Sequence, residues 1–396
     1  MKSSLPKMMK MYSVFVLITL YFLSSCTTSN DNQRINSKQF QKISVLESGV
    51  QLTADKEVFD IKSVVQVDSS IEAFIGEEMK VFDIKDEIYV VDRIYSVVKV
   101  FNKNGTLNRV IGKLGEGPGE YTRLFDVTLG NADSSLLFYS NDSHKIIEYD
   151  FQGGFIKKIE VPFFAYYFVN LPQSSKYFFY INHNSSEINE KKNLLVTDQN
   201  LKVTNKYFPY TKDEIPVIAF SGKIVKNEEG LLYANALEDT IYQIDQSLAI
   251  SSKYVFDFGQ FSCPIDMKDN IAKMTKNLPE KSYLESTFLE NKKALAFSFT
   301  HKRKRIKGFW SKTSSKFVTS GKSTSTSLIH ILSVPVGITE NDYFISFIKP
   351  ETLNAYLQDD KDYLRTIKVD FPDLYNKLIR IKEGDNPLII TYQLKI

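Results

Sequence analysis

The sequence predicts an all-β chain folded as a six-bladed β-propeller, and three observations support this prediction. Short runs rich in β-branched and aromatic residues, such as residues 88–91 and 97–101, are bounded by turn-forming residues. Strand-like segments that end in Asn or Asp return every 47 or 48 residues. A repeat of this length is typical of propeller blades with about four strands each. The 396 residues also include 29 Phe and 22 Tyr, which favour half-buried sheet.

The N-terminal 25 residues have the pattern of a signal peptide. Lysines come first, followed by an apolar run at residues 11–22 that is too short to span a bilayer as a helix. The run ends in Leu23-Ser-Ser-Cys26, which resembles a bacterial lipobox. We therefore expect Cys26 to carry the lipid of an outer-membrane lipoprotein, and residues 26–42 to form a flexible polar tether. The alternative is an ordinary secretory signal with an incidental cysteine, and the membrane face that displays the domain stays open.

Removal of the signal segment leaves the chain without net charge. The segment contains three of the 50 basic residues and no acidic residue, so 47 basic residues face 47 acidic ones. A globally basic nucleic-acid binder is disfavoured, because phosphate binding needs a concentrated positive field. With Cys26 acylated only Cys263 remains, which excludes an intrachain disulfide. Because the four His are not paired and no Cys/His cluster exists, we expect neither a metal site nor a cofactor.

The residues that end the repeated strands are Asn102, Asp150, Asp198 and Asp245. Each is followed by a turn and a new strand. A side-chain oxygen at such a position can accept a hydrogen bond from the backbone two residues on and so close the turn. We interpret these residues as turn caps rather than ligands. Helical solenoids of this period are disfavoured, because the repeats lack an apolar period of about 3.6 residues.

Blades are expected at residues 81–112, at segments that end near 150, 198 and 245, and on either side of residue 321. A helical insertion at about 264–280 delays the fifth blade, placed at about 293–320, and the sixth begins near 328–332. A helix at 371–381 precedes a last strand at 386–396. That strand is expected to pair with a strand at 64–67 and to close the ring, so the propeller spans residues 43–396.

Several segments resemble a known family. Residues 88–92, 100–105, 111–112, 115–121 and 386–392 are similar to the six-bladed β-propeller lipoproteins of Bacteroidetes, which are relatives of NHL-repeat propellers. The resemblance covers most of residues 43–396 and is most specific at 81–126 and 383–396. It implies a six-bladed propeller in the cell envelope, and it carries no catalytic residues across.

Candidate ligand-binding residues lie near strand ends, where we expect propeller loops to meet at a central funnel. They are Arg93, Arg123, Asp126, Asn141 and His144. Each residue also suits a turn or a contact between blades. The glycine-rich residues 112–119 are interpreted as a crossover between blades, because the Lys-Ser/Thr of a phosphate loop is missing.

The basic run at residues 301–305 is expected on a strand. Alternation along a strand then places Lys302 and Lys304 on one face, which is a candidate patch for an anionic ligand such as an uronic or sulfated glycan. A solvated outer strand or turn is the alternative.

No catalytic motif of sialidases, α/β-hydrolases or zinc proteases is found, and no EF-hand loop. The leading hypothesis is a non-catalytic module on a lipid anchor that binds a glycan, a small molecule or an envelope protein at the funnel. A propeller-scaffold glycan hydrolase or lyase is the alternative, followed by a structural subunit of an outer-membrane complex. Two carboxylates about 5–10 Å apart in a deep pocket would favour the enzyme. A shallow mouth lined by aromatic and Arg side chains would favour binding.

Overall fold

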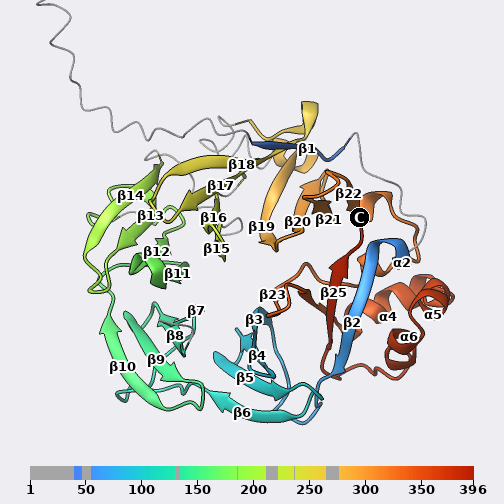
Figure 1. The fold of residues 1–396 in the computed structure, drawn as a ribbon, viewed down its shortest axis with the longest axis horizontal. Helices are drawn as coiled ribbons and strands as arrows, with labels where there is room; N and C mark the ends of the chain where they lie inside the picture. The colour runs from blue at the N-terminus through green and yellow to red at the C-terminus, as the bar shows by residue number, and fades with distance from the viewer. Residues whose placement is uncertain are drawn as a thin grey trace, which may run out of the picture. The chain divides into compact units, whose positions relative to one another are not determined.

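The computed structural model describes residues 40–46, 55–130, 134–184, 186–210, 222–235, 237–264 and 276–396. In these residues the strands form six small sheets, five with four strands and one with five. Figure 1 shows the sheets as the blades of a ring, each with its first strand nearest to the central axis. The predicted six-bladed β-propeller is therefore confirmed.

Blades 1 to 3 follow one another along the chain, and each is a four-stranded antiparallel sheet. Blade 1 consists of β3 (Glu78–Ile84), β4 (Glu87–Asp92), β5 (Val97–Asn102) and β6 (Leu107–Ile111). Blade 2 consists of β7 (Asp126–Leu129), β8 (Ser135–Ser140), β9 (Lys145–Asp150) and β10 (Phe155–Glu160). Blade 3 consists of β11 (Tyr167–Leu171), β12 (Lys176–Tyr180), β13 (Lys192–Thr197) and β14 (Val203–Pro209).

Blades 4 and 5 continue the ring, and blade 4 gains a fifth strand from the N-terminal region. Blade 4 consists of β15 (Lys223–Asn227), β16 (Gly230–Ala234), β17 (Thr240–Asp245) and β18 (Ile250–Asp257). Strand β1 (Gln41–Ser44) pairs in parallel with β18 at the outer edge of this blade. Blade 5 consists of β19 (Ser282–Glu290), β20 (Ala294–His301), β21 (Lys304–Ser311) and β22 (Phe317–Thr319).

Blade 6 joins the two ends of the ring. It combines β23 (Gly337–Ile338), β24 (Phe344–Ile348) and β25 (Leu388–Leu394) with β2 (Phe59–Gln66) from the start of the domain. Strands β2 and β25 are antiparallel, from the Phe59–Leu394 pair to the Gln66–Leu388 pair. The predicted closure of the ring by the C-terminal strand is confirmed, and it removes the exposed edge that an open ring would leave.

Hydrophobic contacts between neighbouring blades hold the ring together. The second strand of a blade is covered by other blades on both faces, so β8 is buried at all six positions and β16 at all five. Strands buried on both faces have nearly continuous apolar runs, as these do. Val91 of blade 1 and Phe138 of blade 2, for example, belong to one buried cluster.

The turn caps predicted from the repeat are confirmed for three residues. Oδ1 of Asp150 accepts hydrogen bonds from the backbone N–H groups of Gln152 and Gly154, each at 2.8 Å. Asp198 and Asp245 bind the backbone two and four residues on in the same way. Asn102 differs, because its Nδ2 donates to the Thr106 hydroxyl while Oδ1 of Asn104 accepts from the Thr106 backbone.

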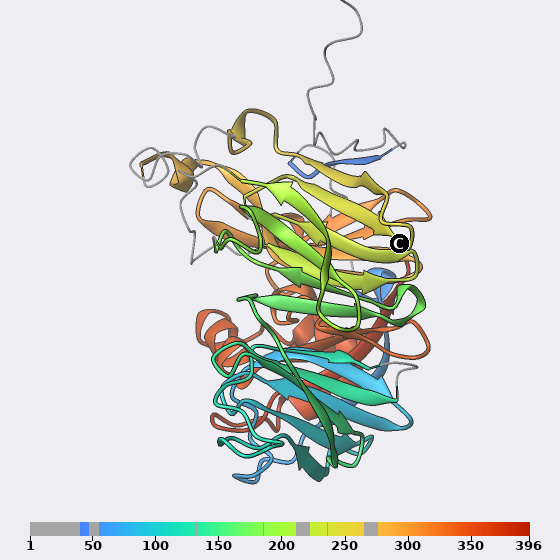
Figure 2. The same cartoon turned by 90° about the vertical axis from the view of Figure 1, so that its left-hand side faces the viewer.

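The ring has two faces that differ in their connections. Each inner strand begins at the face where the chain crosses from one blade to the next, which we call the crossover face. It ends at the opposite face, where the first strand turns into the second, which we call the turn face. The helices α4 (Pro350–Asp359), α5 (Arg365–Asp370) and α6 (Pro372–Leu378) connect β24 to β25 at the crossover side. In Figure 2 these orange-red helices lie on one side of the ring and the C-terminus lies on the other.

Four further short elements lie between or beside the strands. A helical turn, α2 (Asp55–Val58), precedes β2, and 3-10 turns η2 (Pro172–Ser174), η3 (Gly259–Phe261) and η6 (Ser320–Lys322) lie between or after strands. In the described residues no helix has the length and apolar character needed to cross a membrane.

Some predicted elements need correction. The strand expected at 328–332 is a 3-10 turn, η7 (Leu328–His330), and blade 6 begins only at β23. The helix expected at 371–381 is confirmed as α6, whereas α4 and α5 were not predicted. Most of the helix expected at about 264–280 lies outside the described residues, and its end is the 3-10 turn η5 (Leu278–Glu280).

Candidate functional site

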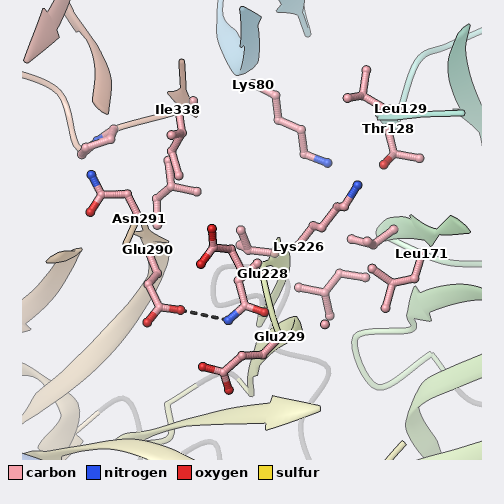
Figure 3. Close-up of a pocket in the computed structure, with 18 of the residues that line it drawn as sticks. Lys80, Thr128, Leu129, Leu171, Lys226, Glu228, Glu229, Glu290, Asn291 and Ile338 are labelled. Atoms are coloured by element: carbon pink, nitrogen blue, oxygen red, sulfur yellow. Dashed lines mark hydrogen bonds between the residues drawn. The ribbon is translucent and has the colours of Figure 1, made fainter. Parts of the chain in front are cut away.

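A pocket of about 480 Å³ occupies the central channel of the ring. Its lining comes from the inner strands of all six blades, mainly from their ends at the turn face and from the turns that follow. The pocket therefore reaches from the turn face along the inner strands as far as Lys223, the first residue of β15 (Lys223–Asn227). Figure 3 shows part of the lining, with side chains that extend into the channel from several blades.

The walls of the pocket are largely aliphatic. The apolar side chains come from different blades and include Val127, Leu129, Val169, Leu171, Val225, Leu289, Val336 and Ile338. Phe82 is the one aromatic residue in the lining that the structure describes, and no Arg is present there. The described lining therefore differs from the aromatic and Arg-lined mouth that was expected to favour binding over catalysis. Its shape and chemistry suit a ligand with an apolar body.

Charged residues at the rim are mostly paired with one another. Lys292 forms an ion pair with Glu228 at 3.1 Å, and both side chains are exposed. Lys253 lies 3.3 Å from Glu229 and 3.0 Å from Glu290. The exposed Lys292–Glu228 pair contributes little to stability, whereas the Lys253–Glu290 pair is largely buried. Together these pairs leave few of the described rim charges without a counter-charge.

Glu290 is buried beneath the rim, and its side chain is 3% exposed. It contacts several of the surrounding polar residues. It accepts hydrogen bonds from the Asn227 amide (dashed in Figure 3) and from the Tyr254 hydroxyl, and it pairs with Lys253 and Lys312. Burial opposes its ionisation, yet the two lysines and these donors hold the pKa of Glu290 below its ordinary value. The carboxylate is therefore ionised and fully engaged, and it ties blade 4 to blade 5.

Lys80 and Asp126 form the charged wall between blades 1 and 2. Nζ of Lys80 lies 2.6 Å from Oδ1 of Asp126, and it also donates to the Val127 carbonyl at 3.1 Å. Asp126 is fully buried and accepts from the backbone N–H of Phe168 in blade 3. The charge of Asp126 balances that of Lys80. The third N–H group of Lys80 can donate a hydrogen bond to a ligand in the channel. Figure 3 shows Lys80 and Lys226 extending toward each other from opposite walls.

Lys223 differs from the other lysines of the pocket. It is the first residue of β15 and is half-buried in the channel wall of blade 4. Among the residues that the structure describes, no acceptor forms a hydrogen bond or ion pair with its Nζ. Burial, reinforced by the nearby charge of Lys80, lowers the pKa of Lys223 to about 8, and Asp126 offsets this effect only in part. Within the described residues, this lysine therefore has no direct ion-pair partner, and it lines the channel together with aliphatic side chains.

The five predicted ligand residues do not line this pocket. Asp126 is buried behind it, in the ion pair with Lys80. Arg93 and Arg123 are exposed on the crossover side, where Arg93 lies 3.7 Å from Glu77 and Arg123 covers the Phe125 ring at 4.9 Å. Asn141 is buried and accepts from the Tyr139 hydroxyl, and the exposed His144 closes the same turn with its backbone N–H. These contacts give Asp126 and Asn141 structural roles, while a ligand role for any of the five stays a prediction.

The basic run at residues 301–305 does not lie on one strand: it covers the end of β20, a two-residue turn and the start of β21. Lys302 and Arg303 both have positive φ, 47° and 66°, and form the two-residue turn between β20 and β21. Lys302 and Lys304 therefore do not share one face of a strand. Lys302 lies over the Phe261 ring at 4.4 Å and Arg305 pairs with Glu285 at 2.6 Å. An anionic-ligand role for Lys302 and Lys304 is left as a prediction, and Cys26 lies outside the described residues.

The lysines of the pocket were missed in the sequence, for a physical reason. Lys80, Lys223 and Lys226 lie on the first strands of their blades, which carry no turn signal and no regular alternation. A faint signal exists in β15, whose five residues include two lysines in a strand that should be buried at the centre of a ring. In the described residues, no group of three or more His, Cys, Asp or Glu is placed to hold a metal ion.

Comparisons with known proteins support the fold. A crystal structure from Bacteroides fragilis NCTC 9343, named as an assumed exported protein, superposes with a TM-score of 0.72 at 16% identity, over 90% of this chain and 100% of that one. A DUF4221 family member from Bacteroides vulgatus ATCC 8482 gives a TM-score of 0.55 at 12% identity, over 86% and 99% of the two chains. At these identities the likeness concerns the fold alone.

A search of curated proteins finds no match. The family described as "Domain of unknown function (DUF4934)" matches residues 41–393, which include every blade of the propeller. Because this match covers most of the chain, the protein belongs to the DUF4934 family.

Proposed function

We propose that the protein is a binding propeller of the cell envelope that takes a small organic anion into its central channel. The observation that carries this proposal is Lys223, a lysine of the pocket that forms no hydrogen bond or ion pair with any described residue and lines the channel together with aliphatic side chains. An unpaired charge in such surroundings is costly, and a bound carboxylate or phosphate would compensate it. The ligand we expect has one anionic group and an apolar body of a few carbon atoms or more.

The charge balance of the lining agrees with a ligand of low negative charge. Six lysines and four carboxylates line the pocket, and the buried Asp126 lies behind Lys80. This leaves a net charge of about +1 when the group is taken together, because six positive charges meet five negative ones. A singly charged ligand would neutralise the channel, whereas a polyanion would meet the rim carboxylates Glu228 and Glu229.

We favour binding over glycan hydrolysis, because the two carboxylates that share Lys253 are an exposed Glu229 and a Glu290 whose oxygens are already engaged. Glu290, the buried carboxylate of the lining, already accepts from Asn227 and Tyr254 and pairs with two lysines. A carboxylate held in this way neither gives up a proton nor attacks a sugar readily, because its donors stabilise the ionised form. Among glycans, acidic sugars fit the lysines better than neutral ones do.

A thermal-shift panel on the purified protein tests the proposal. The probes are isocaproate, glucuronate, inorganic phosphate and glucose. We expect isocaproate to raise the melting temperature by about 3 °C or more at saturation, and glucose to leave it unchanged. Titration calorimetry should then show about 10- to 100-fold weaker isocaproate binding in Lys223→Met, because a charge-assisted contact is lost.

The matched control is Lys293→Met, which removes an exposed lysine on the turn face outside the pocket lining. Its affinity should equal that of the wild type. The proposal is wrong if no anion of the panel binds, or if both variants bind every anion as the wild type does.

An envelope location with a lipid anchor completes the proposal. The signal pattern and Cys26 support it, and so does the fold shared with a protein named as an assumed exported protein. Metabolic labelling with radioactive palmitate should label the wild type and not Cys26→Ala, and fractionation should move the variant out of the membrane fraction. Equal labelling of both proteins, or a wild type in the cytosol, would contradict this part.

A further inference from the structure

One lysine of the channel pocket has surroundings that differ from those of the other lysines. Lys223 is the lysine of the pocket for which the described residues provide no carboxylate or carbonyl acceptor. Lys80 donates to Asp126 and Val127, Lys253 to Gln243 and Glu290, and Lys312 to Glu290 and Asn291. Acceptors of this kind hold an amine in its ammonium form, and Lys223 lacks them.

The surroundings of Lys223 favour the neutral amine. Aliphatic side chains of neighbouring inner strands, Val127, Val169 and Val225, line the pocket with it. The charged groups that act on it from other blades are Lys80 and Asp126, which are already paired with each other. A desolvated lysine beside another cation is the arrangement that makes an amine nucleophilic at neutral pH.

We propose that Lys223 forms a reversible imine with the carbonyl carbon of a small oxo acid bound in the channel pocket. The neutral Nζ attacks the carbonyl carbon and gives a carbinolamine, which loses one water molecule to form the C=N bond. No oxidant or reductant is needed, and hydrolysis regenerates the amine and the oxo acid. This inference rests on the proposed anion binding, and it names the ligand class as an aldehyde or ketone that also carries a carboxylate.

The positions of the other lysines suit such a ligand. Lys226 lies on the same strand as Lys223, and Figure 3 shows it extending into the channel toward Lys80. A carboxylate beside Lys80, whose charge acts on Lys223, would bring the adjacent carbonyl carbon of a short oxo acid toward Lys223. The aliphatic wall at Leu129 and Leu171 would contact an apolar tail.

Reductive trapping with ketoisocaproate tests the inference. The purified protein is incubated with this acid and sodium cyanoborohydride, and the adduct is located by peptide mass spectrometry. We expect one adduct per chain at Lys223, with a mass gain equal to that of the acid less one oxygen atom. Its formation should rise with pH around a midpoint near 8, below that of exposed lysines.

Three variants separate the possible outcomes. Lys223→Arg keeps the positive charge and cannot form an imine, so it should yield no adduct at this position. Lys293→Met, outside the pocket lining, should bind isocaproate and yield the adduct at Lys223 as the wild type does. Lys226→Arg should still yield the adduct at Lys223. Isocaproate binding without any adduct in the wild type would overturn the imine and leave the proposed function standing. If the wild type neither binds isocaproate nor forms the adduct, both the proposed function and the imine are wrong. An adduct spread evenly over surface lysines would contradict the imine at Lys223.

Discussion

Lys80 and Asp126 form an ion pair between the inner strands of blades 1 and 2, with 2.6 Å between Nζ and Oδ1. Asp126 also accepts from the backbone of Val127 and of Phe168, so it links three blades with its one carboxylate. Replacing it with Asn should lower the free energy of unfolding by about 2–4 kcal/mol, because Lys80 loses its counter-charge in the channel wall. The same variant should bind isocaproate about 3- to 10-fold more tightly, since a second unpaired cation then faces the ligand.

Urea unfolding and titration calorimetry give the two quantities for Asp126→Asn. A stability equal to that of the wild type would show that the pair contributes nothing to the ring. Weaker binding of isocaproate would contradict the proposed anion binding, because removal of a negative charge beside the channel should favour an anion.

Asp92 and Lys99 form a second buried pair, at the crossover side of blade 1. Their charged atoms are 3.2 Å apart, with side chains 0% and 4% exposed, and Asp92 also accepts from the backbone of Gly76, Ile94 and Tyr95. We expect Asp92→Ala to lower the free energy of unfolding by about 3–5 kcal/mol, because the buried ammonium group of Lys99 then lacks its counter-charge.

The neighbouring residue provides the control for Asp92. Arg93 makes an exposed contact of 3.7 Å with Glu77, so Arg93→Ala should change stability by less than about 1 kcal/mol. Urea unfolding of both variants measures the difference, and equal losses would show that burial of the pair does not matter here.

A tyrosine and an asparagine two residues later form a repeated contact at the end of the second strand. The Tyr139 hydroxyl donates to Oδ1 of Asn141 at 2.8 Å and accepts from the Ala165 backbone at 2.9 Å. Tyr180 makes the same contacts with Asn182 and Gly222, and Tyr233 donates to Asn235. Each hydroxyl that also accepts fixes the chain as it crosses to the next blade.

Tyr139→Phe should therefore lower the free energy of unfolding by about 1–3 kcal/mol, because two buried polar groups lose their partner. Tyr95→Phe, at a half-exposed tyrosine, should cost less than about 0.5 kcal/mol. Chemical denaturation at one pH compares the two. We expect Asn141→Ala to bind isocaproate with the affinity of the wild type, because Asn141 contacts Tyr139 and not the ligand. Loss of isocaproate binding in this variant would show that Asn141 binds the ligand.

Several features of the fold were predictable from the sequence because they depend on neighbouring residues. The caps at Asp150, Asp198 and Asp245 bind the backbone two and four residues on, and such local contacts leave a repeated signal. Closure of the ring was predictable because the apolar C-terminal segment had to find a partner at an open edge.

Other features depend on contacts that the sequence does not reveal. Residues 328–330 form a 3-10 turn because the Asp55 carboxylate, from the other end of the domain, accepts from the Ser327 hydroxyl and the Leu328 backbone. The turn at Lys302 and Arg303 was missed because two-residue turns of positive φ usually contain Asn or Gly. The pocket was missed because its lysines come from blades on opposite sides of the ring.

We expect Lys223 to lower the free energy of unfolding, because its charge is poorly compensated in the channel without a ligand. Its pKa in the folded protein is about 8, below the ordinary value of 10.5, so between these pH values the unfolded chain binds more protons and stability rises with pH. At neutral pH the buried charge is therefore a cost. Lys223→Met should raise the free energy of unfolding by about 1–3 kcal/mol at pH 7, and this gain should shrink as the pH rises toward 10.

Urea unfolding at two pH values measures this effect, with Lys293→Met as the control that should stay within about 0.5 kcal/mol of the wild type. A variant that gains stability while it loses ligand binding would identify Lys223 as a residue kept for function. A loss of stability in Lys223→Met would mean that the lysine supports the fold instead.

The most direct test of the account is a crystal structure of the protein with isocaproate. We predict that the ligand occupies the channel pocket, with its carboxylate within hydrogen-bonding distance of Nζ of Lys223 and its methyl groups against Leu129 and Leu171, toward the turn face. An empty channel in crystals grown at saturating isocaproate would contradict the account. So would a ligand on the crossover face beside Arg93, Arg123 or His144.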